Sequence, residues 1–332
     1  MDKYTFRRTF VQSSNLQSVN ERRPNARKIA EFTGHRESIY ALATMEGGAG
    51  IYSAGGDGLV VGWMKDRNPE STGTVAAKVP GSVYALCSIS TRPVLLAGQN
   101  QYGIHRIDLK TYESASVATG KAAIFTLAEG ASNGLVYAGL STGELIGLDY
   151  ETLEIRNRIQ LSNTSIRAVA VHPGGHEIAV GSSDHHIRIY RTDETEPVLQ
   201  YHWQGHVNSV FSLTYSPDGR SLLSAGRDAR VMRWDAADAY RSVGSVNAHL
   251  HTIHQASYSP DGKHFLTCSM DKTIKIWSSD DLRLLRVIDR GRHGGHSSSV
   301  NRLTWLDDFH FASAGDDRRV ILWQLHLDEN SL

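Results

Sequence analysis

Cysteine is scarce in this sequence. Its 332 residues include only Cys87 and Cys268, and both lie within apolar stretches that have the character of strands. Cysteine in such a setting usually behaves as a small buried hydrophobe. Two isolated cysteines cannot form the framework of several disulfides that holds small secreted domains together, so we expect the protein to reside in a reducing compartment.

The chain also lacks an excess of either charge, because 35 Lys and Arg residues balance 35 Asp and Glu residues. A net charge of zero gives no overall attraction to nucleic acid or to an anionic membrane. Residues 1–18 contain no apolar core of the kind found in a signal peptide, and no apolar run approaches the length of a membrane span. We therefore expect a cytoplasmic protein that binds neither nucleic acid nor membrane.

Motifs for common cofactors are absent too. The sequence has no Walker loop, no dinucleotide fingerprint and no zinc signature. It does contain 16 histidines, but a metal site needs convergent ligands. The adjacent His185 and His186 would point to opposite faces of a strand. His251 and His254 could meet, but we expect no metal site and no cofactor.

What the sequence does contain is a repeat. A run of small residues followed by Asp, with an aromatic residue six positions later, occurs clearly four times, and weaker copies fill the gaps. The seven copies end 41 to 46 residues apart, at Trp63, Ile107, Leu148, Tyr190, Trp234, Trp277 and Trp323. Self-similarity at a period near 43 residues is typical of β-propeller blades.

A second segment keeps the same period. It consists of a small residue, then Ile or Val, then a variable residue, and it starts at Ser38, Ser82, Ala123, Ser165, Ser209, Thr252 and Ser299. Its alternation and β-branched residues predict strands. Turn-forming residues such as 172–175, 216–219 and 259–262 follow it. A unit of about four short strands repeated seven times predicts an all-β, seven-bladed β-propeller of four-stranded antiparallel blades.

Together with the Asp and the terminal Trp, a pair of Gly or Ala with His before the first strand resembles the WD-repeat family. These pairs are Gly34-His35, Gly205-His206, Ala248-His249 and Gly295-His296. The resemblance covers roughly residues 26 to 325. It is strong in blades one, five, six and seven, partial in blade four, and weak in blades two and three. Seven blades is also the common number in this family.

The ring needs an additional strand to close. After Trp323 only nine residues, 324–332, remain, which is too few for an outer strand and its loop. Residues 27–32 have the place in the repeat of an outer strand, so we expect the N-terminal part of the chain to complete the last blade and remove its open edge. The propeller would then span 26–332. Residues 1–25 would form a polar tail or an extra strand around residues 4–11.

His35, Ser53 and Asp57 have the residue types of a hydrolase triad. The set recurs, with a Trp, at the blade period, whereas an active site occurs once in a chain. The resemblance implies a buried structural network from Trp through Ser and His to Asp in each blade. The sets are His35, Ser53, Asp57 and Trp63; His206, Ser224, Asp228 and Trp234; His249, Thr267, Asp271 and Trp277; and His296, Ser313, Asp317 and Trp323.

The family geometry implies which end of the ring binds. The variable residue of each first strand should face the channel mouth, which gives Tyr40, Tyr84, Phe125, Arg167, Phe211, His254 and Asn301. The residue before each repeat Asp or its substitute should face it as well, which gives Gly56, Gln99, Leu140, Ser183, Arg227, Met270 and Asp316. Aromatic residues and Arg are enriched at binding hot spots. Alternatively, these aromatics pack on one another as a plug.

These residues favour a protein-interaction scaffold that binds a peptide or protein partner at its mouth, and not an enzyme. Arg167 and Arg227 face a single carboxylate, Asp316, and the loop 290–293 adds basic residues at the same end, so an acidic or phosphorylated group on the partner is favoured. The alternative is an enzyme or cofactor-binding propeller with a site in the channel. It would require a single cluster of titratable residues there that does not repeat.

Overall fold

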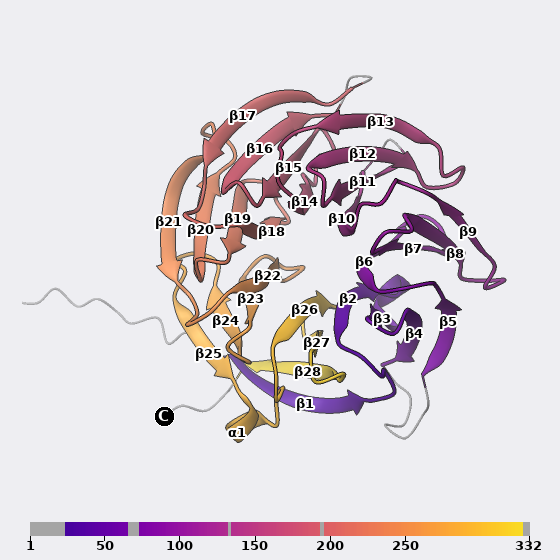
Figure 1. Ribbon diagram of the computed structural model, residues 1–332. Coiled ribbons are helices and arrows are strands. Elements are labelled where there is room, and N and C mark those ends of the chain that lie inside the picture. Colours follow the sequence, from indigo (N-terminus) through magenta and orange to yellow (C-terminus); the bar gives the residue numbers. More distant parts are fainter. Residues whose placement is uncertain (1–23, 66–72, 132–133, 193–195, 328–332) are drawn as a thin grey trace, which may run out of the picture.

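A computed structural model describes residues 24–65, 73–131, 134–192 and 196–327. In these residues the chain forms seven four-stranded antiparallel sheets, and Figure 1 shows them arranged as blades around a central channel. The predicted seven-bladed β-propeller is therefore confirmed. The segment expected as a tail or an extra strand, including residues 4–11, lies outside the described residues, apart from Pro24 and Asn25, which belong to a strand.

Each blade runs from an inner strand at the channel to an outer strand at the rim. Blades one to three contain β2 (Ile39–Thr44), β3 (Gly50–Gly55), β4 (Leu59–Met64), β5 (Thr74–Lys78); β6 (Val83–Ser88), β7 (Val94–Gln99), β8 (Ile104–Asp108), β9 (Ser114–Val117); and β10 (Ile124–Glu129), β11 (Leu135–Leu140), β12 (Glu144–Asp149), β13 (Ile155–Gln160). A short 3-10 helix, η1 (Glu46–Gly48), joins β2 to β3.

The remaining blades follow the same order, except that the last one takes its outer strand from the start of the chain. They contain β14 (Ile166–Val171), β15 (Glu177–Ser182), β16 (His186–Arg191), β17 (Val198–Gln204); β18 (Val210–Tyr215), β19 (Ser221–Gly226), β20 (Arg230–Asp235), β21 (Arg241–Asn247); β22 (Ile253–Tyr258), β23 (His264–Ser269), β24 (Ile274–Ser278), β25 (Leu284–Ile288); and β26 (Val300–Trp305), β27 (His310–Gly315), β28 (Val320–Leu327), β1 (Pro24–Phe32). A single turn of helix, α1 (Arg290–His293), precedes β26.

The hydrophobic core lies between the blades. Burial is highest in the second strand of each blade and falls toward the rim: five of the six residues of β23 are buried, whereas six of the seven residues of β17 are exposed. Between blades five and six, Leu223 packs in one cluster with Phe265 and Trp277. The inner strands of neighbouring blades contact one another all the way around, including β26 with β2. A blade therefore buries both of its faces only when it packs between two neighbouring blades.

The N-terminal strand closes the ring. β1 pairs antiparallel with β28, with Lys28 opposite Trp323, and the strand order of the last blade is β1-β28-β27-β26. Arg319 reinforces the pairing because its guanidinium bonds Glu31 of β1 at 3.1 Å and Asp317 at 2.6 Å. Phe32 is buried and stacks on Trp63 of blade one, with ring centroids 5.2 Å apart. The predicted N-terminal closure is confirmed, and the strand begins at Pro24, two residues before the expected boundary.

Neither helix in the described residues approaches the length and apolarity needed to cross a membrane. Both cysteines are free thiols: Cys268 is buried and Cys87 is half-buried by its exposed area. Burial raises the pKa of each thiol to about 12, which keeps both protonated near neutral pH. Neither is therefore suited to act as a thiolate nucleophile.

Removal of β1 should open the ring. A chain that starts at residue 34 keeps His35 but loses the partner strand of β28 and the buried Phe32. Loss of a buried Phe side chain alone costs about 3–5 kcal/mol, so we expect this chain to aggregate or to melt roughly 10 °C or more below the full chain. A chain that starts at residue 22 should melt like the full chain. Equal melting temperatures for all three, measured by circular dichroism, would show that β1 is not needed for closure.

Candidate binding site

A β-bulge occurs at the same place in the inner strand of every blade. In blade one, Ile39 pairs with Gly55 and Ala41 pairs with Ala54, so Tyr40 has no partner in the ladder. The equivalent unpaired residues in the other six blades are Tyr84, Phe125, Arg167, Phe211, His254 and Asn301. A bulge bends the strand and redirects the extra side chain. The repeat therefore supplies seven side chains that leave the ladder at one level of the ring.

These seven side chains line a single cavity of about 690 Å³ at the channel. Met270 and Asp316 line it as well, as the sequence predicts. Sequence analysis missed four further lining residues: Lys272, Ser298, Ser299 and Arg302. Arg227 is exposed and is not among the residues that line the cavity.

Of the seven residues expected at the mouth from their place before the repeat Asp, five do not line the cavity. Gln99 and Leu140 are both fully buried, and neither lines the cavity. They pair with Val83 and Ile124 as Gly55 pairs with Ile39, so they lie within the ladder, one residue earlier in the blade than Gly56. The amide of Gln99 donates to the carbonyl of Pro80. Gly56, Ser183 and Arg227 do precede a repeat Asp, but they are not among the residues that line the cavity either, so the rule holds only for Met270 and Asp316.

The bulge residues contact one another around the channel, and we call these seven residues the mouth belt. Ring centroids of Tyr40 and Tyr84 are 5.3 Å apart, and those of Tyr84 and Phe125 are 5.7 Å apart. The guanidinium carbon of Arg167 lies 3.9 Å from the ring centroid of Phe125 and 5.6 Å from that of Phe211, a cation–π sandwich. Phe211 in turn stacks on His254 at 6.3 Å.

Hydrogen bonds complete the mouth belt on the side of blade seven. The imidazole Nε2 of His254 is 3.2 Å from Ser299 Oγ, which donates to Asn301 at 3.0 Å. The Asn301 amide donates across the closure to the carbonyl of Ile39 at 3.0 Å. The aromatics therefore do pack on one another, yet all four remain partly exposed.

The cavity carries unpaired positive charge. Within the described residues, neither Arg167 nor Arg302 forms an ion pair with a carboxylate. Burial lowers the pKa of both guanidinium groups, and repulsion from Arg227 lowers that of Arg167 further. Asp316, the one carboxylate in the lining, already accepts a hydrogen bond from Asn301 at 2.8 Å. An anion entering the cavity would meet two guanidinium groups that have no competing partner.

Ser299 and His254 superficially resemble a nucleophile and its base. Burial, helped by repulsion from Arg302, lowers the pKa of His254 to about 4, so the imidazole is neutral near pH 7. The Ser299 hydroxyl donates its proton to Asn301, so it accepts from His254 Nε2. An activated serine needs the reverse arrangement, in which the imidazole accepts the hydroxyl proton. The channel geometry therefore does not favour the enzyme alternative.

Arg302 was missed although the sequence contains a signal for it. The residue after the bulge is small or short in blades one to five: Ala41, Ala85, Thr126, Ala168 and Ser212. Blade six has Gln255 at this position, and its side-chain oxygen Oε1 accepts from the backbone N–H of Leu303 at 2.8 Å. Arg302 is the one charged residue in the series, and comparison of the blades at this position would have found it.

The repeated His, Ser or Thr, Asp and Trp residues form four hydrogen-bonded chains. In blade five, His206 bonds Asp228 at 2.9 Å and Ser224 at 2.8 Å, and Trp234 donates to Ser224 at 2.9 Å. The other three blades repeat this arrangement with the residues predicted for them. Burial raises the pKa of each Asp, but hydrogen bonds from His and backbone N–H groups outweigh it and lower the pKa overall.

Blade four replaces this series of hydrogen bonds with a different network around Asp184. It has no equivalent histidine, and Arg188 bonds Asp184 at 2.6 Å instead. Ser182 and Ser162 also donate to Asp184, at 2.6 and 2.9 Å. Sequence analysis registered blade four only as a partial repeat. The arginine that makes the substitution lies on β16, away from the positions that define the motif.

The basic loop expected at the mouth lies elsewhere. Residues 290–293 form α1, whose first turn is capped by the Asp289 side chain accepting from Arg292 N–H at 2.8 Å. α1 packs against β1 at the outer edge of the ring, and none of its residues lines the cavity (Figure 1). The loop therefore adds no residue to the lining of the cavity, because it leaves the outer strand β25 at the rim.

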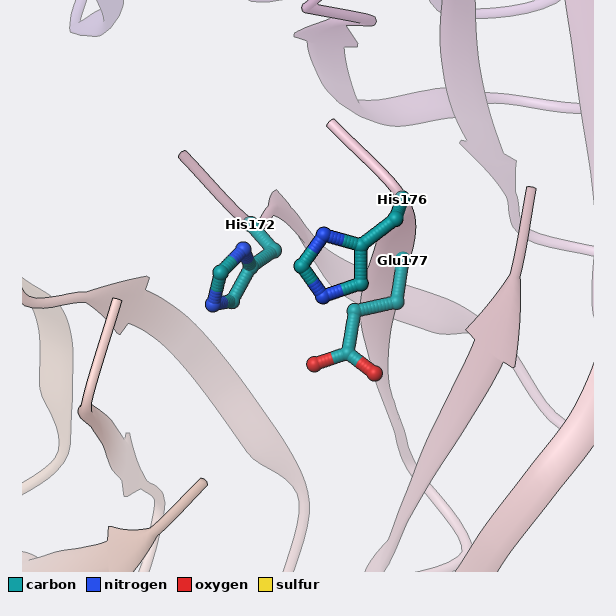
Figure 2. A group of neighbouring side chains, drawn as sticks. All are labelled: His172, His176 and Glu177. Atoms are coloured by element: carbon teal, nitrogen blue, oxygen red, sulfur yellow. The ribbon is translucent and has the colours of Figure 1, made fainter. Parts of the chain in front are cut away.

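The histidines also gather differently from the sequence expectation. His254 belongs to the mouth belt, whereas His251 is exposed and is not among the residues that line the cavity. Across the described ranges, the one group of three possible metal-ligating side chains consists of His172, His176 and Glu177 (Figure 2). It lies in the turn between β14 and β15, at the opposite end of the ring from the mouth. Sequence analysis treated this segment only as a turn.

Comparisons with known proteins agree with this architecture. The family model "WD domain, G-beta repeat" matches residues 157–191, 197–235, 240–278 and 289–324, which run from the outer strand of blade three to blade seven. The WD40 β-propeller domain of Doa1, a solved crystal structure, superposes with a TM-score of 0.77 at 18% identity, covering 90% of this chain and 97% of that one.

Curated relatives are similar over parts of their length. Echinoderm microtubule-associated protein-like 3 of Homo sapiens is 26% identical over 250 residues, covering 63% of this chain and 28% of that protein. The 66 kDa stress protein of Physarum polycephalum is 24% identical over 305 residues, covering 88% of this chain and 47% of that protein. Periodic tryptophan protein 2 of Saccharomyces cerevisiae is 24% identical over 236 residues, covering 69% of this chain and 23% of that protein. The chain thus spans less than half the length of each of these relatives.

The repeated hydrogen-bonded sets of His, Ser or Thr, Asp and Trp should matter for stability and not for partner binding. Asp228→Ala removes the acceptor for His206 and for the backbone N–H groups of Val207 and Arg230. Unsatisfied buried donors cost about 1–3 kcal/mol, and we expect this loss in the free energy of unfolding measured with urea. Asp238→Ala, which breaks only an exposed ion pair with Arg241 in the same blade, should cost under about 0.5 kcal/mol. Equal losses would contradict the structural role.

Proposed function

Because the chain is a WD-repeat β-propeller, we propose that it is a protein-interaction scaffold whose channel mouth binds a peptide or a protein loop carrying an acidic or phosphorylated group. Propellers of this family typically hold other proteins. The one observation that carries the proposal for this chain is the mouth belt, in which all seven blades contribute a bulged side chain to one cavity.

The exposed aromatic surface supports a proteinaceous partner. Tyr40, Tyr84, Phe125 and Phe211 form one edge of the cavity and remain partly exposed. Contiguous exposed apolar surface in a folded protein commonly marks an interaction site, and aromatic side chains dominate the binding energy of protein interfaces. A volume of about 690 Å³ is in the range of sites that hold a small ligand. It accommodates a few side chains of a partner rather than a folded domain.

The charge of the cavity selects the chemistry of the partner. Arg167 and Arg302 have no carboxylate partner among the described residues, and Arg227 lies close enough to repel Arg167. A carboxylate or phosphate that accepts hydrogen bonds from a guanidinium forms a short, charge-assisted pair. In the partly dry channel such a pair is stronger than on an open surface. An acidic or phosphorylated side chain is therefore the preferred anchor.

We also propose the cytoplasm as the compartment, and no cofactor in the channel. Both cysteines are free thiols, which suits a reducing environment. No arrangement in the cavity favours a catalytic alternative, because the Ser299 hydroxyl is bonded in the wrong direction for activation by His254. We therefore propose that the protein acts by holding its partner.

Substitutions at the mouth should weaken binding without unfolding the protein. Phe211→Ala removes one aromatic surface, and Arg227→Glu reverses an exposed charge beside Arg167. We expect each to reduce capture of the partner from native lysate at least about tenfold, the ~1.4 kcal/mol of one modest hot-spot contact. Capture is quantified by mass spectrometry, and the melting temperature should stay within a few degrees of the wild type.

Arg220→Glu is the matched control for the charge reversal. Arg220 is an exposed arginine of the same blade, but it lies in the turn between β18 and β19, at the opposite end of the ring. The proposal requires this variant to capture the partner like the wild type. It fails if Arg220→Glu loses as much capture as Arg227→Glu, or if Phe211→Ala unfolds, since the aromatic would then be part of the core.

A further inference from the structure

The end of the ring opposite the mouth carries a second group of side chains with binding chemistry. His172, His176 and Glu177 come from the turn between β14 and β15 of blade four. Figure 2 shows the two imidazole rings side by side, with the carboxylate next to them. One ligating atom from each residue lies within 4.8 Å of the other two. The group is half-buried at His172 and Glu177 and exposed at His176.

The hydrogen bonds of His172 fix which of its two nitrogens could bind a metal. Its Nε2 lies 3.1 Å from the carbonyl oxygen of Gly219. Since a carbonyl only accepts, Nε2 carries the proton and Nδ1 carries the lone pair. That lone pair accepts from Gly174 N–H at 2.9 Å, so a metal at Nδ1 would replace the N–H of this exposed glycine. Metal-binding histidines almost always donate their other ring N–H to a carbonyl or carboxylate, which fixes the tautomer. Gly219 performs that role here from blade five.

Glu177 is oriented in the same way. The hydroxyl of Tyr240 in blade five donates to Glu177 Oε1, and Tyr215 bonds Tyr240 at 2.8 Å. One carboxylate oxygen is thereby held by an outer hydrogen bond while the other remains available. Such outer partners commonly support the carboxylate ligands of metal sites. Blade five therefore fixes two of the three side chains that blade four supplies.

A glycine keeps the space between the two imidazoles open. A Cβ atom at Gly174 would lie 2.7 Å from His176 Nδ1, closer than real Cβ atoms approach a neighbour, and 3.1 Å from His172 Nδ1, which is a tight contact. The two rings are 4.3 Å apart between centroids. No hydrogen bond holds the His176 ring among the described residues, so this exposed ring is free to rotate.

We propose that His172, His176 and Glu177 bind one transition-metal ion of the Zn²⁺ class. Two imidazoles and one carboxylate suit zinc, which takes nitrogen and oxygen ligands at about 2.0–2.2 Å. Ligands on one ion are therefore at most about 4 Å apart, and rotation of His176 closes the remaining gap. Three protein ligands leave a fourth position for water or for a group from outside the chain. The proposal replaces the sequence expectation of no metal site, and it is independent of the proposed function of the mouth.

The test uses the full-length protein without an affinity tag, treated with a chelator and then titrated with Zn²⁺ alone. We expect one equivalent to bind by calorimetry and to raise the melting temperature, because the ion binds the folded state. His176→Ala removes an exposed ligand and should weaken binding at least about tenfold. Gly174→Ala leaves all three ligands in place but fills the space between the rings, and it should weaken binding similarly.

His251→Ala is the matched control, because His251 is exposed and lies at the other end of the ring. It should bind Zn²⁺ like the wild type. Absence of saturable binding at one equivalent would overturn the proposal and leave the group as a hydrogen-bonded contact between blades four and five. Binding that is unchanged in both His176→Ala and Gly174→Ala would also overturn it, because the ion would then occupy another place.

Discussion

The pairing of β1 with β28 is the constraint on which the rest of the structure depends. No blade of this protein buries its own faces, so each needs a neighbour on both sides, and a ring without closure would leave two blades half-exposed. The chain satisfies this by bringing residues from its two ends into one sheet. The ion pairs of Arg319 with Glu31 and Asp317 tie that sheet to the turn that also binds His296. Closure also brings Asn301 next to Ile39, so the mouth belt is complete only in a closed ring.

The bulge in each inner strand converts this scaffold into a site. Strict alternation would send every second residue of an inner strand into the packing between blades. The extra residue breaks the alternation, so Ile39 is fully buried while the next side chain, Tyr40, lines the channel. Because the bulge is part of the repeat, its residue type changes from blade to blade without altering the packing around it. The fold therefore separates stability, which lies in the buried residues, from recognition, which lies in the bulged ones.

The same separation explains what the sequence could predict. The period of the repeat was enough for the fold and the closure. The geometry implied by the WD-repeat resemblance added the seven residues of the mouth belt, because each has the same place within its blade. The prediction failed at most positions before the repeat Asp: Leu140 is buried because it pairs with Ile124 as Gly55 pairs with Ile39, one residue before the mouth position. It missed Arg302, which breaks the pattern at a position that was not compared. It also missed the group around His172, because its supporting contacts to Gly219 and Tyr240 join different blades.

The charges in the channel are the strongest physical reason to expect a ligand there. A guanidinium removed from water without a partner lowers stability, and the lowered pKa of Arg302 reflects that loss. The cation–π contacts of Arg167 offset part of it, but they supply no hydrogen-bond acceptors for its N–H groups beyond Ser183. A structural role alone would be better served by an uncharged residue, as at Ala41, the equivalent of Arg302 in blade one. An anionic group bound at the mouth would accept hydrogen bonds from both guanidinium groups together. Their positive charges are therefore balanced only in the bound state.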